Sequence, residues 1–428
     1  MSRRRGILLL LLLVALLLVA PLSATAAQFD FIPICTASRW QGRPRLSQNR
    51  VVWEDLRSGS TWRVYSYQLS TRTESFVAAG WRPTSSGDAA VFEKSGGGPL
   101  SFYDFSSHAS TELTLAHQYP WDPAMAGDRI AYIDSRGGQT DLFVYDLASR
   151  TETRITSDSA RQLAPSIDGS KVVWQDDRNG NWDIYACDLT SGVEEPITTD
   201  PAPQYRPSVW GNVVAWQDRR HGNWDIYGYK FVPKVTWAIC RHPAEQYRPS
   251  VWNDRVVWQD KRNGTWDIYL RDLSTYATIR VTTGRRDEYM PSVYGDYIAW
   301  MDTRNDTPQR SNPDIYAARI IRLPAQLYLR APRSLALSQN CYYSGLLRPR
   351  HAAGLHSVRL QCWHYEIGRW VLRRTLYPVN RDTAADSPVT DFSDSFRFPR
   401  RGYWRLRAYH ADAEHSPSYS AWVRVTVR

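Results

Sequence analysis

Aromatic and arginine side chains stand directly before a proline that recurs along the chain. The residue two positions before this proline is aromatic in five places, and the residue one position before it is arginine in four. These residues are Trp81, Trp121, Tyr205, Tyr247 and Tyr289, together with Arg43, Arg82, Arg206 and Arg248. Aromatic faces stack on sugar rings or peptide side chains, and guanidinium groups bind carboxylates and phosphates. We interpret these positions as a ligand-binding site, with packing between neighbouring repeats as the alternative.

Catalytic and metal-binding motifs do not accompany these residues. The sequence has no G-x-S-x-G, no H-E-x-x-H and no C-x-x-C motif. His351, His410 and His415 fall in expected strand loops, where histidines are usually solvated, so we expect no metal and no cofactor. We therefore predict that the protein is not an enzyme. The alternative is a lyase or hydrolase that acts on an acidic polysaccharide.

A period of 42 residues determines where the candidates lie. Trp174, Trp216, Trp258 and Trp300 follow one another at this spacing, and weaker matches toward the N-terminus give seven units. Alternating apolar residues, with Asn-Gly or His-Gly dipeptides between them, predict four β-strands in each unit. Four strands in a unit of this length are typical of a β-propeller blade. The candidate residues then surround one mouth of the central channel.

Six units also carry an Asp-x-Arg motif, from Asp55 and Arg57 to Asp302 and Arg304. A residue that recurs in every blade is usually one that every blade needs for its structure. We therefore interpret these pairs as contacts that hold the hairpin and join one blade to the next, rather than as catalytic groups.

The N-terminal segment is predicted to close the ring. The seventh unit lacks the outer strand that the others contain, whereas Ile34 stands ten residues before Pro44, as Ile197 stands ten before Pro207. We predict that residues 31–36 complete the last blade and thereby remove the exposed sheet edges.

The repeated sequences Val-Val-Trp-Gln-Asp, Arg-Asn-Gly and Asn-Trp-Asp-Ile-Tyr carry a resemblance to a known family. Residues 31–323 resemble the TolB-like, WD-type propeller repeats of bacterial exported proteins. The resemblance implies an exported scaffold that binds partners. It does not imply the Tol–Pal function of TolB itself, because nothing outside the repeats matches that protein.

A second domain is expected where the period stops. Residues 325–428 contain short alternating strands and resemble the small immunoglobulin-like β-sandwiches of secreted bacterial surface proteins. We expect Cys341 and Cys362 to form a disulfide bond there, because an exported protein meets an oxidising compartment. The chain has five cysteines, so at least one thiol stays unpaired within it.

The first residues resemble a secretory signal peptide. Arg3, Arg4 and Arg5 precede an apolar run and a small-residue cleavage site, which predicts removal of residues 1–27, with an uncleaved membrane anchor as the alternative. We expect no transmembrane span in the mature chain.

The net charge of +10 is unevenly distributed. Residues 325–428 hold 16 arginines, no lysine and 7 acidic residues, whereas the segment before them, without residues 1–27, is nearly neutral. This distribution excludes nucleic acid as an expected partner of the main domain and predicts contact of the small domain with an anionic wall polymer.

Taken together, the sequence predicts an all-β protein: a signal peptide (1–27), a seven-bladed β-propeller closed by its N-terminal strand (28–324) and an immunoglobulin-like β-sandwich (325–428). We expect it to be secreted, periplasmic or on the cell surface. The expected function is to bind an envelope or cell-wall glycan, or a surface protein, through the propeller mouth.

Overall fold

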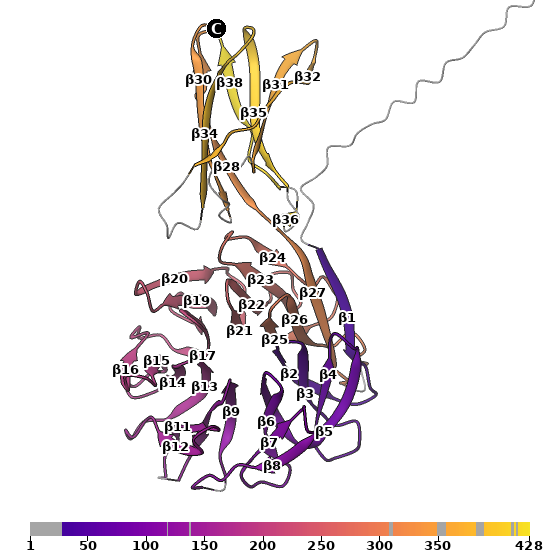
Figure 1. The fold of residues 1–428 in the computed structure, drawn as a ribbon, viewed down its shortest axis with the longest axis vertical. Helices are drawn as coiled ribbons and strands as arrows, with labels where there is room; N and C mark the ends of the chain where they lie inside the picture. Colours follow the sequence, from indigo (N-terminus) through magenta and orange to yellow (C-terminus); the bar gives the residue numbers. More distant parts are fainter. Residues whose placement is uncertain are drawn as a thin grey trace, which may run out of the picture.

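The computed structural model describes residues 28–117, 119–136, 138–307, 311–348, 357–381, 389–411, 415–416 and 418–428. The predicted signal peptide and His351 lie outside the described residues. The described chain is all β, and it forms a ring of sheets followed by a two-sheet sandwich (Figure 1). The described residues contain no helix that is long and apolar enough to cross a membrane.

The ring is built from antiparallel four-stranded sheets that all place their first strand next to the central channel (Figure 1). The long strand β5 serves two of them, since residues up to Ala79 pair with β4 and residues from Gly80 pair with β6. From the inside outward, six of the described sheets are β2 (Gln41–Ser47), β3 (Arg50–Asp55), β4 (Arg63–Gln68) and β5 (Thr73–Ser86); β5, β6 (Ala89–Lys94), β7 (Leu100–Asp104) and β8 (Ala109–Glu112); β9 (Trp121–Ala126), β10 (Arg129–Asp134), β11 (Asp141–Asp146) and β12 (Thr151–Arg154); β13 (Gln162–Asp168), β14 (Lys171–Asp176), β15 (Asp183–Asp188) and β16 (Val193–Pro196); β17 (Gln204–Trp210), β18 (Val213–Asp218), β19 (Asp225–Lys230) and β20 (Val235–Cys240); and β21 (Gln246–Trp252), β22 (Arg255–Asp260), β23 (Asp267–Asp272) and β24 (Thr278–Arg280).

The last sheet of the ring joins the two ends of the propeller. It contains β25 (Glu288–Tyr294), β26 (Tyr297–Asp302) and β27 (Asp314–Pro324), and its outer strand is β1 (Gln28–Cys35). β1 pairs antiparallel with β27, from Gln28 opposite Arg322 to Cys35 opposite Ile315. The predicted strand is therefore present but runs from Gln28 to Cys35, so it begins three residues before the predicted segment 31–36 and ends one residue before its end.

A repeated serine links the innermost strands of neighbouring sheets. Its hydroxyl accepts a hydrogen bond from a backbone N–H of the next sheet, as Ser166 does from Val209 at 3.2 Å and Ser208 from Val251 at 3.1 Å. Ser292 of the last sheet accepts one from Leu46 of the first sheet at 2.9 Å. The same contact that joins consecutive sheets thus also joins the last to the first.

The apolar side chains of each strand explain why these sheets stack. Trp53, Trp174, Trp216, Trp258 and Trp300 are fully buried between sheets, and they pack on the β-branched residues of their own and adjacent sheets. Burial of large aromatic surface is the main source of stability at such interfaces.

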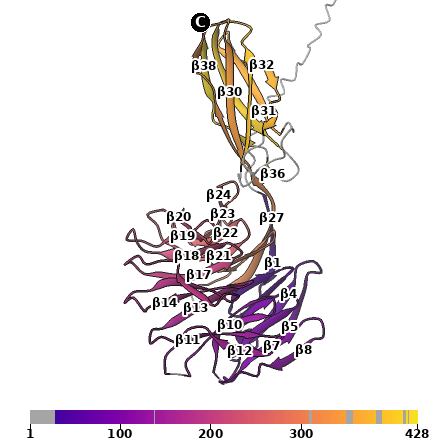
Figure 2. The ribbon, with the colours of Figure 1, turned by 60° about the vertical axis from the view of Figure 1, so that its left-hand side comes forward.

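Residues after Pro324 form two sheets that enclose a separate core. One sheet contains β28 (Gln326–Arg330), β30 (Asn340–Arg348), β34 (Thr390–Arg397) and β33 (Asn380–Arg381); the other contains β29 (Ser334–Leu335), β38 (Val423–Val427), β35 (Gly402–His410), β31 (Arg359–Glu366), β32 (Arg369–Leu376) and β37 (Ser418–Tyr419). The strand β36 (His415–Ser416) pairs with β27. This β-sandwich stands beside the rim of the ring near β24 (Figures 1 and 2). Its immunoglobulin-like character stays a prediction.

The disulfide bond expected between Cys341 and Cys362 is absent from the structure, which contains both residues as buried free thiols. Cys341 lies on β30 and Cys362 on β31, which belong to opposite sheets of the sandwich. Both side chains instead face the common core of the sandwich, beside Trp404 and Phe392.

Candidate binding site at the propeller mouth

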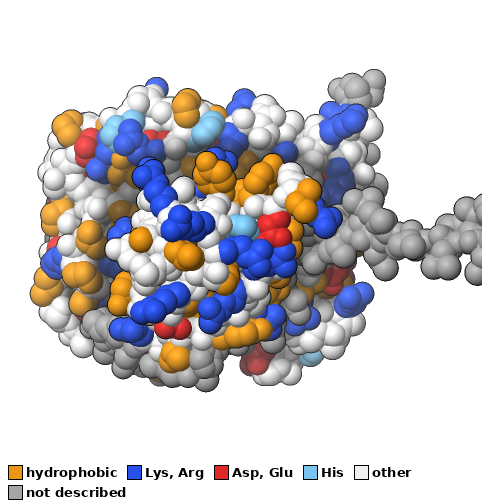
Figure 3. All heavy atoms as spheres, turned by 90° about the horizontal axis from the view of Figure 1, so that it is seen from above, with side chains coloured by type: hydrophobic (Ala, Val, Ile, Leu, Met, Phe, Trp, Pro, Cys, Tyr) orange, Lys and Arg blue, Asp and Glu red, His pale blue; other side chains and the backbone are white. Residues whose placement is uncertain are grey.

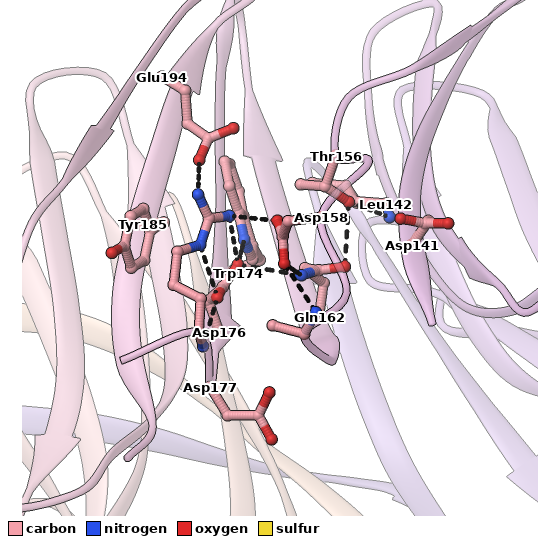
Figure 4. Close-up of polar contacts among 12 residues, drawn as sticks. Asp141, Leu142, Thr156, Asp158, Gln162, Trp174, Asp176, Asp177, Tyr185 and Glu194 are labelled. Atoms are coloured by element: carbon pink, nitrogen blue, oxygen red, sulfur yellow. Dashed lines mark hydrogen bonds and ion pairs between the residues drawn. The ribbon is translucent and has the colours of Figure 1, made fainter. Parts of the chain in front are cut away.

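The Asp-x-Arg motif is a structural element of the six sheets that contain it, as Figure 4 shows for Asp176. Asp176 is fully buried and accepts hydrogen bonds from the indole of Trp174 at 2.9 Å and from Arg178 at 2.6 Å. Arg178 also forms ion pairs with Glu194 and with Asp158, which belongs to the connection from the preceding sheet. Its guanidinium lies 4.2 Å from the centre of the Tyr185 ring. These contacts confirm the interpretation that the motif holds the hairpin and joins neighbouring sheets.

The residue before each recurring proline has an unusual backbone conformation. In all seven described sheets its φ lies between 46° and 55°, a region that side-chain-bearing residues rarely adopt. These residues are Arg43, Arg82, Asp122, Ala164, Arg206, Arg248 and Met290. The pairing register shifts at this point, as between Tyr205 and Ser208, so each innermost strand contains a bulge. A bulge changes the direction in which a side chain points.

In five of the sheets, a side chain of the preceding sheet accepts a hydrogen bond from the backbone of the bulge. Gln175 accepts a hydrogen bond from the backbone N–H of Arg206 at 3.1 Å, and Gln217 accepts one from Arg248 at 3.2 Å. In the first sheets of the ring the acceptor is a carboxylate instead, because Glu54 binds the N–H of Arg82 at 2.8 Å. The Gln of the repeated Trp-Gln-Asp sequence therefore serves the backbone of the next sheet.

Three of the predicted aromatic residues form a continuous row with the tryptophans of the hairpin loops. Neighbouring ring centres in this row are 5.1 to 6.4 Å apart, and each ring is half-buried. We call this row the aromatic belt; its members are Trp182, Tyr205, Trp224, Tyr247, Trp266 and Tyr289. The tyrosines thus pack between sheets, as the alternative interpretation holds, and they also keep part of each ring exposed.

The other two predicted aromatic residues lie apart from the belt. The indole of Trp81 donates a hydrogen bond to Glu93 at 2.6 Å, and the ring of Trp121 lies 5.9 Å from the guanidinium of Arg82. Among the described residues, no ring contact joins either tryptophan to the belt.

Sequence reasoning missed Trp40, whose ring takes the place of a belt tyrosine in the first sheet. A Cβ atom on Gly42 would lie 2.1 Å from the Trp40 ring, so only glycine leaves room for it. Trp40 in turn contacts Trp62 edge to face at 5.0 Å. The signal was a glycine two positions before Pro44, where other units have an aromatic residue.

The predicted arginines lie in two electrostatic environments. Arg43 pairs with Glu54 at 3.0 Å and Arg82 with Glu93 at 3.1 Å. Arg206 and Arg248 line the central channel and form no ion pair among the described residues. Burial, with repulsion from Arg206 and two further arginines, lowers the pKa of Arg248 to about 9, so it remains protonated at neutral pH.

The channel contains a cavity of about 220 Å³, lined by residues of the innermost strands around the recurring prolines. Arg45, which the sequence reasoning also missed, lines it together with Asp122, Arg206 and Arg248. Arg45 is exposed to the solvent of the channel, although the ring surrounds it. Such an arrangement can bind a small anionic group. Among the described residues, no cluster of His, Cys, Asp and Glu side chains is arranged to hold a metal ion.

Comparison with known proteins places the chain by fold. No family model matches the sequence, and no curated protein matches it either. The structure is similar to the acylaminoacyl peptidase of Pyrococcus horikoshii, with 12% identity, a TM-score of 0.53, and 73% of this chain and 58% of that chain covered. It is also similar to an oligogalacturonate lyase from Vibrio parahaemolyticus (11% identity, 69% and 97% covered, TM-score 0.49) and to TolB from Acinetobacter baumannii (15%, 65% and 78%, TM-score 0.39).

The ring of antiparallel sheets, together with the likeness to the acylaminoacyl peptidase, defines an all-β protein of the propeller class. The chain spans less than two thirds of the length of the acylaminoacyl peptidase that it matches. The comparisons contradict the sequence-based prediction that the protein is not an enzyme, because acylaminoacyl peptidases share this fold with TM-scores of 0.53 and 0.51. The absence of the G-x-S-x-G and H-E-x-x-H motifs does not exclude catalysis, because enzymes and binding proteins share the propeller fold.

Proposed function

We propose that the protein is exported and binds an envelope glycan or a surface protein through the propeller mouth. In this proposal residues 28–324 form the binding module and residues 325–428 attach it to the envelope. The observation that carries the proposal is the aromatic belt, whose half-buried Tyr205 and Tyr247 directly precede the unpaired arginines Arg206 and Arg248 that line the channel. Exposed aromatic faces beside cationic groups are suited to sugar rings and to peptide side chains.

The belt can be tested by replacing Tyr205, Tyr247 and Tyr289 together with alanine. Binding to purified cell-wall fragments and to a glycan array should weaken by at least about tenfold, since each lost ring contact is worth roughly 0.5–1.5 kcal/mol. The matched control is Tyr294→Ala. Tyr294 lies on the same strand, β25, as Tyr289, but its ring packs on that of Trp252, with ring centres 5.3 Å apart, and not on the belt. Equal binding by the triple variant and the control would refute the role of the belt.

A second surface, on the sandwich, supports attachment to an anionic wall polymer. Arg405 of β35 lies 4.0 Å from the ring of Trp422 and 4.7 Å from that of Trp370, and Arg407 lies 4.5 Å from Trp422. The Nε of Arg405 and the indole nitrogen of Trp363 are buried and make no hydrogen bond within the described residues. Basic side chains, which in residues 325–428 are all arginines, gather on the end of the molecule that the sandwich forms (Figure 3).

Salt dependence tests this second surface. Binding of the full chain to an anionic wall polymer should fall as ionic strength rises, because exposed charges are screened beyond about 8 Å at physiological salt. The Arg405→Gln and Arg407→Gln double variant should bind less and show a smaller salt effect. The control is Arg330→Gln, on a strand of the opposite sheet. Binding that is insensitive to both salt and the double variant would refute this part of the proposal.

A catalytic function on an acidic polysaccharide is the second candidate. Two cavity residues, Arg45 and Asp122, depart from the repeat, and a carboxylate beside arginines in a channel is a feature that chemistry could use. Incubation of the full chain with polygalacturonate should then release unsaturated or reducing ends, and Asp122→Asn should abolish this release. Unchanged polymer length in the presence of the wild-type chain would refute this candidate for that substrate class.

A further inference from the structure

We propose that Arg45, Arg206 and Arg248 form a binding site inside the channel for an anionic group, either a carboxylate or a phosphate. This inference rests on the proposed function and deepens it, since it assigns the chemistry of the ligand at that mouth.

The arginines around the channel are unequally neutralised, because Arg43 and Arg82 pair with glutamates whereas Arg206 and Arg248 do not. The position that supports each bulge is Glu54 or Glu93 in the first two sheets and Gln175, Gln217 or Gln259 in later ones. A glutamate in this position both binds the backbone and neutralises the nearby arginine; a glutamine does only the first. Positive charge therefore remains on the side of the channel where Arg206 and Arg248 lie.

Arg45 brings a third cation into the same cavity. The residue after the recurring proline is serine in four other units, and its hydroxyl binds the backbone of the next sheet. Arg45 replaces that serine, and the only hydrogen bond of its side chain among the described residues is a long one of 3.5 Å to the Pro44 carbonyl. Its guanidinium lies near enough to Asp122, Arg43 and Arg206 for their charges to act on it.

Only one carboxylate, Asp122, lines the cavity beside these arginines in the described chain, and it forms no ion pair with any of them. Although both side chains reach the solvent of the channel, the surrounding walls partly desolvate them and lower the pKa of Arg45 and Arg206, and neighbouring guanidinium groups lower it further. Cations that repel one another in a partly desolvated cavity are stabilised when an anion enters. Arginine also presents several donors that match the oxygens of carboxylates and phosphates.

The size of the cavity limits what enters it. Its volume of about 220 Å³ is smaller than the roughly 300–1,000 Å³ of typical small-molecule sites. It therefore admits one acidic group rather than a whole oligomer. The remainder of a glycan or peptide would extend from the channel onto the rim, where the aromatic belt lies.

Isothermal titration of the full chain with inorganic phosphate, and separately with citrate, tests the site. We expect at least one of them to bind in a salt-sensitive manner, and the preferred anion identifies a phosphate or a carboxylate source. Arg45→Ser should weaken this binding about tenfold, because a charge-assisted hydrogen bond is lost, and Arg206→Gln with Arg248→Gln should weaken it further. Serine is the residue that four other units have at this position, so this variant is designed to keep the fold, and equal melting temperatures without anion check it.

Arg129→Gln is the control, because it removes one arginine that lies away from the cavity and pairs with Asp146. No binding of either anion, or equal binding by Arg45→Ser and Arg129→Gln, would overturn the inference. The tyrosine triple variant distinguishes it from the proposed function. If that variant binds wall fragments normally while Arg45→Ser loses phosphate or citrate, the belt proposal fails and the anion site stands.

Discussion

Glu288 is a buried carboxyl group in a position that the repeat otherwise fills with glutamine. The equivalent residues are Gln41, Gln162, Gln204 and Gln246, all buried. The Thr198 hydroxyl donates a hydrogen bond to Gln204 at 2.8 Å, and the Thr282 hydroxyl donates one to Glu288 at 3.1 Å. The Gln204 amide also donates to the carbonyl of Ala202, which an ionised carboxylate cannot do. We predict that Glu288→Gln stabilises the propeller at neutral pH.

The magnitude follows from the pKa. Burial, and next the negative charge of Asp302, raise the pKa of Glu288 from 4.5 to about 8. At pH 7 the carboxyl is ionised in the unfolded chain and protonated in the folded one, so folding must take up a proton. With about 1.4 kcal/mol per pH unit above 4.5, this uptake costs roughly 3 kcal/mol at pH 7, a cost that glutamine avoids.

The sign of the pH dependence is fixed by the raised pKa. Below pH 4.5 both states are protonated, and the wild type and Glu288→Gln should differ little in this respect. Between pH 4.5 and about 8 the wild type should lose stability relative to the variant, and above pH 8 the difference should stay constant.

Urea unfolding at pH 4, 7 and 8.5, followed by tryptophan fluorescence, measures this difference. The reverse change, Gln246→Glu, is the matched control and should destabilise the chain at pH 7, because it places a carboxyl group beside Asp260. A Glu288→Gln variant with wild-type stability at pH 7 and 8.5, or one whose advantage grows as the pH falls, would refute the reasoning.

Three further changes test the fold. Arg178→Ala should cost on the order of 3 kcal/mol, measured as a lower melting temperature, because it leaves the fully buried Asp176 without its cation; an unchanged melting temperature would contradict this. Deleting residues 28–35 should expose the edge of β27 and shift the chain to oligomers in sedimentation, whereas a monomer of normal stability would contradict the role of β1 in closure. In the native chain the buried thiols of Cys341 and Cys362 should resist alkylation, and both should react once urea unfolds the chain without a reductant; thiols that react only after reduction would contradict their free state.

The fold was predictable because the same residues that determine strands and hairpins recur in successive units. Trp174 and its equivalents indicate the buried strand, and the Asn-Gly dipeptides such as Asn179-Gly180 indicate the hairpin, where Gly180 has a φ of 86°. Ile34 then revealed the closing strand by its spacing alone, since an outer strand was missing only in the last unit. The bulge before each proline was not predictable, because nothing in Arg206-Pro207 indicates that the first residue has a positive φ.

The candidate site was predictable only where it repeats. Tyr205, Tyr247 and Tyr289 were found because they occupy one position in three units, and they form the aromatic belt. Arg43 and Arg206 looked equivalent in sequence, yet only Arg43 pairs with a carboxylate. Their difference depends on a side chain of the neighbouring strand, Glu54 beside Arg43 and Gln217 beside Arg206, and spacing along the chain does not show such neighbours.

Departures from the repeat are therefore the better guide to function in this chain. A residue that every unit shares can be explained by what every unit needs, as the Asp176–Arg178 pair is. Arg45 in place of a serine breaks a hydrogen bond that joins sheets elsewhere, so the fold gains nothing from it that the serine would not supply. A cation kept at such a position, beside other cations in a cavity, points to an anion that comes from outside the chain.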